Sequence, residues 1–339
     1  QPPGTGLAPP KMPPSHVRGL HPPRTASFST PSVLGPRPAP RAGHSITPLP
    51  HQSLLIFGGW QPPGTYLSDC HLLEMDEGRA LRWKEVRMRD GAETFPCPRA
   101  NHTATRVTDL HVVVFGGWGG EARTRGREDS LDFEAEECTP QGEAPQILDD
   151  VHVLNMSPKG WYWKTLAGLG GSGPHARGGH TAVCMRHGGI LVFGGRAEES
   201  YFNSLHMLDS KSQKPKWAVV QAAGTPPSAR AHHVAVALSQ SQRMAVHGGT
   251  GVHGLQLNDV GIFSSDSSTW EQLHMGPMPS GSLGRSSHAA AALVAAGMGT
   301  GPCADLMVIF GGRVGESRVS SMHVLSLIHA STGGGSVRR

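Results

Sequence analysis

The feature that most constrains this chain is a di-glycine that recurs five times. Each pair directly follows a short apolar run, and the runs read LLIF, VVVF, ILVF, MAVH and MVIF in chain order. The pairs are Gly58-Gly59, Gly116-Gly117, Gly194-Gly195, Gly248-Gly249 and Gly311-Gly312. Short runs of β-branched and aromatic residues that stop at glycine predict buried strands. The repetition therefore predicts an all-β architecture built from copies of one unit.

Each unit carries further landmarks in a constant order. An R-x-x-H motif lies 17 or 18 residues before the di-glycine in four units and 26 residues before it in the last. The motifs are Arg41/His44, Arg99/His102, Arg177/His180, Arg230/His233 and Arg285/His288. A third strand follows the di-glycine, with the patterns SDCHLL, DDVHVL, NSLHML, NDVGIF and SSMHVL. A fourth strand is marked in four units by Trp83, by Trp161 or Trp163, by Trp217 and by Trp270.

Composition agrees with a chain of short strands and turns. Of 339 residues, 45 are Gly and 28 are Pro while only 17% are charged, which excludes a coiled coil or helical bundle. The apolar fraction of 37% is enough for a core, so wholesale disorder is excluded as well. A net charge of +4 without a concentrated basic patch predicts no binding to nucleic acid. The longest apolar run, residues 289–296, is too short to span a membrane.

The five cysteines lie far apart and form no C-x-x-C pair, which is unlike a disulfide framework or a zinc finger. They are Cys70, Cys97, Cys138, Cys184 and Cys303. We therefore expect free thiols in a reducing compartment, which favours the cytoplasm. We expect no cofactor.

Taken together, these motifs resemble the kelch repeat over about residues 25–328. The resemblance implies a kelch β-propeller of four-stranded blades around a central channel. We expect five blades over residues 26–328, closed by an N-terminal strand, and a six-bladed ring is the alternative. Phe28 lies 13 residues before Arg41, where the other units place Trp 13 to 16 residues before Arg. Residues Ala26–Leu34 are therefore predicted to be the missing fourth strand of the last blade.

Three segments are predicted to lie outside the blades. Residues 1–25 carry eight prolines and no periodicity, which predicts a disordered tail. Residues 329–339 are predicted to be a second flexible tail. Residues 118–148 hold eight acidic residues against three Arg and predict a long solvated loop. We expect the chain to be monomeric.

The polar positions that recur in every unit are interpreted as structural. We expect the R-x-x-H arginines and histidines to hydrogen-bond backbone groups between blades, and not to bind metal. The third-strand histidines alternate with apolar neighbours, so we expect them on the side of the blade away from the core. These are His71, His152, His206 and His323. No catalytic motif stands out, so we predict no catalytic residues and no enzyme activity.

The positions that differ between units are the candidates for function, because loops carry specificity. In kelch rings the loops that follow the di-glycines surround one mouth of the channel, where partners bind. Trp and Arg are the side chains that most often anchor protein interfaces. The alternative for the two Trp residues is that they pack under their own loops. The predicted partner-binding residues are Trp60, Trp118, Arg196, Tyr201 and Arg313.

Units two and three are also similar to the kelch-domain receptors that capture C-terminal degrons for cullin-RING ubiquitin ligases. In those receptors an Arg directly after this di-glycine contacts the peptide carboxylate, and Arg196 matches it. Tyr201, Ala231 and His232 stand where those receptors have Arg, Ser and Trp. We predict a non-enzymatic module that binds a protein or peptide partner, with a chain terminus or an acidic segment as its target, as a substrate adaptor or scaffold. The alternative is a propeller enzyme or a lectin-like small-molecule binder with a site in the central channel.

Overall fold

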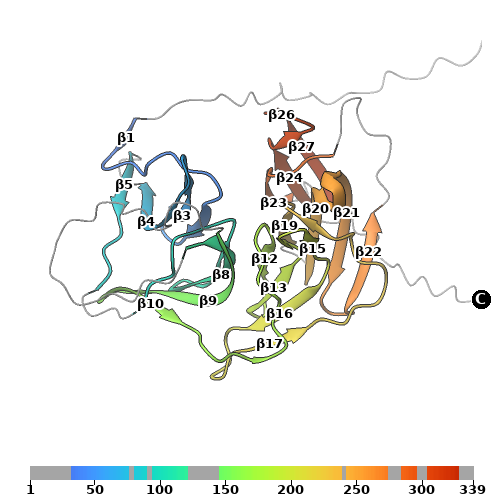
Figure 1. Ribbon diagram of the computed structural model, residues 1–339, viewed down its shortest axis with the longest axis horizontal. Helices are drawn as coiled ribbons and strands as arrows, with labels where there is room; N and C mark the ends of the chain where they lie inside the picture. Colours follow the sequence, from blue (N-terminus) through green and yellow to red (C-terminus); the bar gives the residue numbers. More distant parts are fainter. Residues whose placement is uncertain are drawn as a thin grey trace, which may run out of the picture.

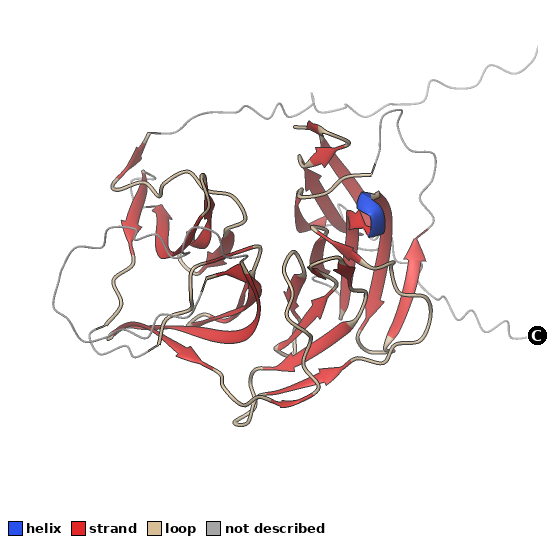
Figure 2. Cartoon of the chain, viewed as in Figure 1, coloured by secondary structure: helices blue, strands red, loops and turns tan. Residues whose placement is uncertain are grey.

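The described chain folds into five sheets that follow one another along the sequence (Figure 1). The structure, a computed structural model, describes residues 32–75, 80–89, 94–120, 145–238, 242–273, 284–295 and 304–327. Within these residues nearly all regular structure is strand, and the one helical segment is the 3-10 turn Val252–Gly254 (Figure 2). The five sheets are the five blades of a β-propeller, as the repeat predicts. The described part of the chain contains no helix with the length and hydropathy of a membrane span.

The strands of each blade run antiparallel and follow chain order from the inner edge outwards. Blade one contains β2 (Ser45–Leu49), β3 (Ser53–Gln61), β4 (Thr65–Met75) and β5 (Leu81–Glu85). Blade two contains β7 (Thr103–Thr108), β8 (His111–Gly119), β9 (Gln146–Ser157) and β10 (Gly160–Thr165). Blade three contains β12 (Thr181–Cys184), β13 (Gly189–Phe193), β16 (Leu205–Asp209) and β17 (Lys216–Val219). Blade four contains β19 (Val234–Leu238), β20 (Arg243–Gly251), β21 (Gln256–Ser264) and β22 (Thr269–Leu273), and blade five contains β23 (Ala289–Ala295), β24 (Ala304–Phe310) and β27 (Met322–Leu327).

Eight two-residue strands complete the blades at their edges. Two extend the turns that carry the R-x-x-H motif: β6 (Arg99–Ala100) and β18 (Arg230–Ala231). Two pairs form small hairpins after the di-glycines of blades three and five: β14 (Arg196–Ala197) with β15 (Ser200–Tyr201), and β25 (Arg313–Val314) with β26 (Ser317–Arg318). Two more, β1 (Val33–Leu34) and β11 (Gly170–Gly171), run parallel to β5 and β17.

The pairing of β1 corrects the predicted closing strand. Val33 and Leu34 lie beside Leu81 and Arg82 of blade one, and not beside the last blade. The predicted strand Ala26–Leu34 therefore extends too far at its C-terminal end. In this fold the segment that enters a blade runs parallel to that blade's own outer strand, as β11 does. The rest of that strand, residues 26–31, lies outside the described residues.

The apolar core lies between the blades. A Trp on the outer strand of one blade packs against a Phe at the end of the second strand of the preceding blade. The ring centroids are 5.0 Å apart in Phe57–Trp163, 5.2 Å in Phe115–Trp217 and 5.1 Å in Phe193–Trp270. The structure thereby selects Trp163, which is buried, over Trp161 as the fourth-strand landmark of its unit. Because each blade shares its core with its neighbours, no blade buries its apolar residues alone.

The di-glycine is the place where neighbouring blades touch through their backbones. A Cβ at Gly116 would lie 2.7 Å from the carbonyl oxygen of Arg177 in the next blade. Gly117 donates its N–H to that same oxygen at 2.9 Å. Both glycines have positive φ, of 62° and 102°. Close approach together with left-handed backbone explains why both positions are glycine.

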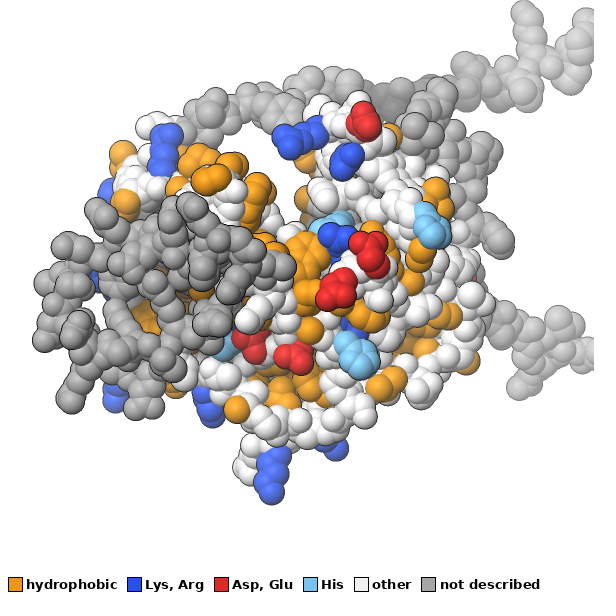
Figure 3. Space-filling view, viewed as in Figure 1, with side chains coloured by type: hydrophobic (Ala, Val, Ile, Leu, Met, Phe, Trp, Pro, Cys, Tyr) orange, Lys and Arg blue, Asp and Glu red, His pale blue; other side chains and the backbone are white. Residues whose placement is uncertain are grey.

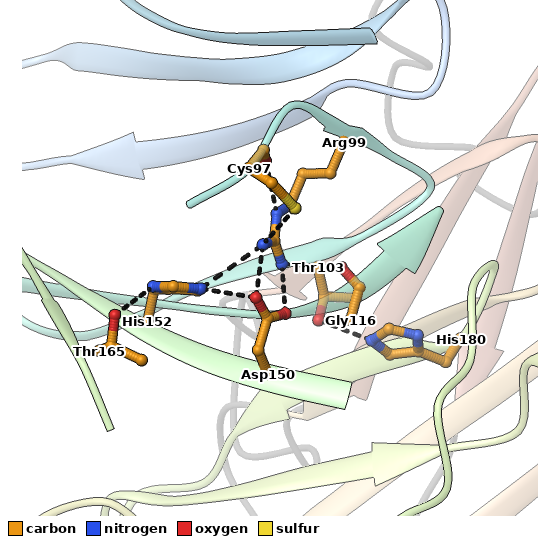
Figure 4. Close-up of polar contacts among 8 residues, drawn as sticks. All are labelled: Cys97, Arg99, Thr103, Gly116, Asp150, His152, Thr165 and His180. Atoms are coloured by element: carbon orange, nitrogen blue, oxygen red, sulfur yellow. Dashed lines mark hydrogen bonds and ion pairs between the residues drawn. The ribbon is translucent and has the colours of Figure 1, made fainter. Parts of the chain in front are cut away.

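The R-x-x-H arginines of blades two to five are buried, the Arg41 side chain is only 4% exposed, and each hydrogen-bonds within its own blade, as Figure 4 shows for blade two. Arg99 donates to the Gly116 carbonyl at 3.2 Å and, through both terminal nitrogens, to the Asp150 carboxylate at 2.7 Å. His152 lies 2.7 Å from the same carboxylate. Burial raises the pKa of Asp150, but the hydrogen bonds from Arg99 and His152 outweigh it and hold that pKa well below its usual range.

Two expectations about these polar residues are wrong. The arginines bond backbone carbonyls of their own blade and not of the neighbour, and in blades one, two and four they also bond a carboxylate of that blade. The third-strand histidines His152 and His206 are buried and do not point away from the core, and in blade two the Asp150 carboxylate and Arg99 bond His152 there.

The R-x-x-H histidines do link the blades, but through side-chain hydroxyl groups. The Nε2 atoms of His102, His180 and His233 each lie 2.9 Å from a hydroxyl of the preceding blade, from Ser45, Thr103 and Thr181 respectively. Burial, helped by the charge of Arg177, lowers the pKa of His180 to about 3, so this imidazole is neutral at pH 7.

The third residue of each R-x-x-H turn has left-handed backbone and carries a second link between blades. These residues are Gly43, Asn101, Gly179, His232 and Ser287, with φ between 52° and 67°. The last four of them donate their N–H to the carbonyl of the same residue in the preceding blade, at 2.7 to 2.9 Å. Four such bonds run from blade one to blade five. Within the described residues, no fifth bond joins Ser287 back to Gly43.

The five blades accordingly form an open arc. The inner strands pack in succession, β2 on β7, β7 on β12, β12 on β19 and β19 on β23. Figure 3 shows an open gap between the first blade and the last on the face that it presents.

Candidate functional site

The residues directly after the di-glycines share one structural position at the mouth of the channel. Each lies beside the second residue of the R-x-x-H turn of its own blade. The pairs are Trp60 with Ala42, Trp118 with Ala100, Arg196 with Gly178, Thr250 with Ala231 and Arg313 with Ser286. These are also the turns whose left-handed residues connect the blades. The positions chosen from the sequence therefore surround the inner edge of the arc.

Blade three differs from the others because its turn contains two glycines in succession. A Cβ at Gly178 would lie 2.8 to 3.1 Å from atoms of the Trp118 indole, which belongs to blade two. A Cβ at Gly179 would lie 3.0 to 3.2 Å from the imidazole of His232, which belongs to blade four. The absence of both side chains lets Trp118 and His232 lie over this turn.

Three side chains from three blades meet there, and we call Trp118, Arg196 and His232 the mouth cluster. The ring centroids of Trp118 and His232 are 5.9 Å apart, with an angle of 56° between the ring planes. The guanidinium carbon of Arg196 lies 5.0 Å from the Trp118 ring, within the range of a cation–π contact. The indole thus contacts both a cation and an imidazole.

The mouth cluster carries positive charge, and no carboxylate of the described residues pairs with it. Burial, together with the charge of Arg196, lowers the pKa of His232 to about 4, so His232 is neutral at pH 7 and Arg196 supplies the charge. Within the described residues no carboxylate forms an ion pair with Arg196, and Glu198 and Glu199 on its hairpin are exposed to solvent. The Arg196 Nε is buried and has no hydrogen-bond partner there. A half-buried guanidinium that an aromatic ring holds in place is suited to bind an anionic oxygen.

The other predicted residues lie at different distances from this cluster. Tyr201 is directly opposite Arg196 in the β14–β15 hairpin and is half-buried. Trp60 is half-buried on β3, opposite Tyr66, and makes no described contact with the cluster. Arg313 is exposed in blade five, where its Nε donates to the Gly315 carbonyl at 2.8 Å. The structure therefore brings Trp118, Arg196 and Tyr201 together and leaves Trp60 and Arg313 at neighbouring positions of the mouth.

His232 is the residue of the cluster that the sequence did not single out for binding. A signal was present, because the third residue of the turn is Gly, Asn, Gly or Ser in the other four units. A histidine there adds an aromatic ring to a left-handed position at the mouth.

The histidines of the described chain do not assemble into a metal centre. Within the described residues no group of three or more His, Cys, Asp and Glu side chains is placed to hold a metal ion.

Comparisons with known proteins agree with the repeat. The chain matches the KLHDC2/KLHL20/DRC7 Kelch-repeats domain over residues 20–145 and 141–301. It is 25% identical over 327 residues to the Host cell factor homolog hcf-1 of Caenorhabditis elegans, covering 88% of this chain and 37% of that protein. It is 27% identical over 239 residues to Adagio-like protein 1 of Oryza sativa subsp. japonica, covering 67% of this chain and 34% of that protein. The chain thus spans about a third of the length of these curated relatives.

A solved structure is similar as well. The structure of YjhT superposes with a TM-score of 0.54 at 18% sequence identity, covering 83% of this chain and 75% of that one. This likeness shows a shared fold and nothing further.

Proposed function

Because this chain belongs to the kelch-repeat family, we propose that it is a non-enzymatic protein-binding module that holds a partner peptide at the mouth of its propeller. Kelch propellers of this family are typical protein-interaction modules. The observation that carries the proposal is the mouth cluster, in which Arg196 lies against Trp118 and has no carboxylate partner within the described chain. Trp and Arg are also the side chains that most often dominate binding energy at protein interfaces.

The chemistry of the cluster favours a carboxylate as the group that is bound. A carboxylate can accept two parallel hydrogen bonds from one guanidinium, and the neutral His232 beside it adds no competing charge. The Trp118 ring limits the motion of the guanidinium, so less conformational entropy is lost on binding. We therefore propose that the partner presents a C-terminal carboxylate or an acidic side chain.

The pairing of three aspartates on the third strands supports this choice over a small-molecule site, which would need acidic residues that converge on a ligand. Asp69, Asp150 and Asp259, on the third strands, are each paired with the R-x-x-H arginine of their own blade. These carboxylates hold the blades in shape.

The proposal is tested with peptides that differ only at the C-terminus. Fluorescence polarisation would compare matched peptides ending in a free carboxylate or in an amide, against the full chain and its Arg196→Gln variant. We expect the carboxylate peptides to bind more tightly, and R196Q to weaken their binding by about tenfold or more, as expected for a hydrogen bond to a charged group. Arg313→Gln is the matched control, since it removes a cation from the same ring of positions but outside the cluster.

Both variants must melt at the wild-type temperature for the comparison to hold. Equal affinity for carboxylate and amide peptides would contradict carboxylate recognition, and equal losses in R196Q and R313Q would contradict the mouth cluster as the site. A wild-type chain that binds none of the peptides would contradict peptide binding altogether.

We further propose that the bound partner is a substrate delivered to a ubiquitin ligase, for which this chain is the adaptor. Affinity purification of the wild-type chain and R196Q from cells is the test. We expect cullin–RING subunits with both chains and partner proteins with the wild type alone. Absence of ligase subunits from both would contradict the adaptor role and leave peptide binding to be judged by the polarisation experiment.

A further inference from the structure

The end of blade three that lies opposite the mouth carries two short turns rich in positive charge. The turn between β12 and β13, residues 185–188, contains Arg186, and the turn between β16 and β17, residues 210–215, contains Lys211 and Lys214. All three side chains are exposed to solvent. Because β13 leads from the first turn to the di-glycine beside the mouth, and β16 returns from there, both turns lie at the far end of the blade.

Two contacts fix the shape of these turns. The hydroxyl of Ser210 donates to the Gly188 carbonyl at 3.1 Å, which holds the turns side by side. Gly188 has a φ of 86°, and a Cβ there would clash with the side chain of Lys211, which thus lies across the first turn. The N–H of Ser212 donates to the Asp209 carboxylate at 3.3 Å and orders the second turn. The cations are therefore carried by turns with a formed structure.

Two further cations extend this surface, one of them from the neighbouring blade. Lys216 is the first residue of β17 and is exposed. Arg106 on β7 of blade two is exposed as well, and the residue before it, Thr105, donates its hydroxyl to a carbonyl of β12 at 3.4 Å. Burial raises the pKa of the Cys184 thiol at the end of β12, and the nearby charges of Lys211 and Arg106 oppose that rise. Cations of two blades thus lie around the end of one strand.

We call these five cations the basic patch: Arg106, Arg186, Lys211, Lys214 and Lys216. Within the part of the chain that the structure describes, no ion pair involves any of them. The carboxylates of Asp109 and Asp209 lie on the adjoining turns, so five cations against two acids leave a charge of +3, whereas the whole chain carries +4. Cations that no carboxylate of their own chain pairs with attract the anionic groups of a partner.

An exposed apolar side chain borders the basic patch. Met207 is 38% exposed, and a Cβ at Gly189 would lie 3.1 Å from its sulfur atom, so this side chain lies beside the turn that Lys211 crosses. The phosphate backbone of a nucleic acid has no apolar group for Met207 and is repelled by the carboxylates of Asp109 and Asp209. A polypeptide presents acidic and apolar side chains together, which fits this surface better.

We propose that the basic patch binds an acidic segment of a partner protein, with carboxylates of the segment on the cations and an apolar side chain of the segment on Met207. The patch and Arg196 lie at opposite ends of blade three, so this inference does not rest on the mouth cluster. A chain with a binding surface at each end holds two protein segments at once. Because the cations are exposed, they act mainly on the rate of association and on its dependence on salt.

Fluorescence polarisation tests the proposal with the full chain and two labelled peptides that both end in an amide. One peptide consists of Glu residues with one central Leu, and the other has Gln in place of every Glu. We expect the wild-type chain to bind the Glu peptide alone. That binding should weaken severalfold when the NaCl concentration rises from about 50 to about 200 mM, because salt screens exposed charges.

Variants locate the binding surface. Lys211→Glu/Lys214→Glu should weaken binding of the Glu peptide by about tenfold or more, since like charges then face each other. Lys164→Glu/Arg318→Glu is the matched control: it changes the net charge equally at exposed positions of blades two and five, and should stay within about twofold of the wild type. Met207→Ala should weaken binding by roughly threefold through loss of apolar contact.

A second patch variant covers the case in which the lysine variant melts below the wild type. Arg106→Gln/Arg186→Gln removes cations from the other two elements of the patch and should weaken binding of the Glu peptide in the same direction. Arg196→Gln shows whether the Glu peptide binds at the mouth instead. A loss in R196Q without a loss in either patch variant would place the peptide there and overturn the proposal.

Other outcomes overturn it as well. Equal losses in the lysine variant and the matched control would show an effect of net charge alone. Tighter binding of a single-stranded oligonucleotide than of the Glu peptide would assign the basic patch to nucleic acid. A wild-type chain that does not bind the Glu peptide would contradict the proposal, while the peptides with a free C-terminal carboxylate would still test the mouth separately.

Discussion

Blades two and three bury the same arginine of the R-x-x-H motif in different surroundings. Arg99 pairs through both terminal nitrogens with the Asp150 carboxylate. Arg177 meets only the Ser204 hydroxyl at that position, at 3.2 Å from Nη1, and its Nη2 has no hydrogen-bond partner in the described chain. The ring of Phe202 instead lies 4.3 Å from the guanidinium carbon of Arg177.

The comparison shows which part of this arrangement the fold requires. Both arginines donate to a di-glycine carbonyl of their own blade, at 3.2 Å from Arg99 and 2.8 Å from Arg177. Burial lowers the pKa of Arg177 to about 10, so it remains a cation at pH 7. A cation bound to the di-glycine carbonyl is therefore common to both blades, while a carboxylate neutralises it in one and the face of an aromatic ring attracts it in the other.

The largest expected effect comes from removing the carboxylate of blade two. Asp150→Asn leaves the buried Arg99 without a counter-charge, and we expect the free energy of unfolding to fall by roughly 3 kcal/mol. Ser204→Ala, the matched change in blade three, should cost less than about 1 kcal/mol. Urea unfolding at pH 7 measures both values. Equal losses would mean that the two arginines depend equally on that position.

The role of the Phe202 ring is tested by replacing Phe202 with the residue that other blades have at this position. The backbone position of Phe202 is occupied by Leu148 in blade two and by Leu257 in blade four, since all three carbonyls accept from the next blade's arginine N–H. Phe202→Leu should lower the free energy of unfolding by roughly 2 kcal/mol, through loss of the cation–π contact and of buried surface. A loss no larger than that of a conservative apolar substitution would show that the ring does not compensate Arg177.

The missing carboxylate of blade three can be restored. Ser204→Asp should raise the free energy of unfolding by about 1 kcal/mol, a modest gain because this position is partly exposed in the other blades. In the S204D background, Phe202→Leu should cost less than in the wild type, because the two groups serve the same cation. A double-mutant cycle measures this coupling, and additive effects would separate the two roles.

The smallest expected effect is a dependence on pH that blade two has and blade three lacks. The pKa of Asp150 is held below its usual range, so its contribution is present above the unfolded-state pKa of about 4 and is lost as the pH falls through the folded-state value. At pH 3.5 the difference in the free energy of unfolding between the wild type and Asp150→Asn should be about 0.7 kcal/mol smaller than at pH 7. The difference between wild type and S204A should stay constant, since Arg177 does not titrate in this range.

The elements of this fold are predictable from the sequence because their signals are local. The apolar run before each di-glycine, the R-x-x-H motif and the fourth-strand Trp lie within one unit, at spacings that a four-stranded blade requires. The same spacing identifies the mouth positions, since the residue after each di-glycine returns to the same place in every blade. Trp118 and Arg196 were found in this way.

Contacts between repeat units cannot be predicted from the sequence of a single unit, so only the tertiary structure shows them. His232 joins Trp118 and Arg196 only because Gly178 and Gly179 leave room over the turn of blade three. The Nε2 of His180 likewise meets the Thr103 hydroxyl of the preceding blade only because blades two and three pack together.

The sequence by itself thus determined the repeating unit, its strands and the ring of mouth positions, because these follow from the order of residues along a strand and its turns. Only the tertiary structure decided which mouth residues touch and how each buried arginine is compensated. The physical reason is that these contacts join residues of different strands and blades, and their distances depend on how the sheets pack.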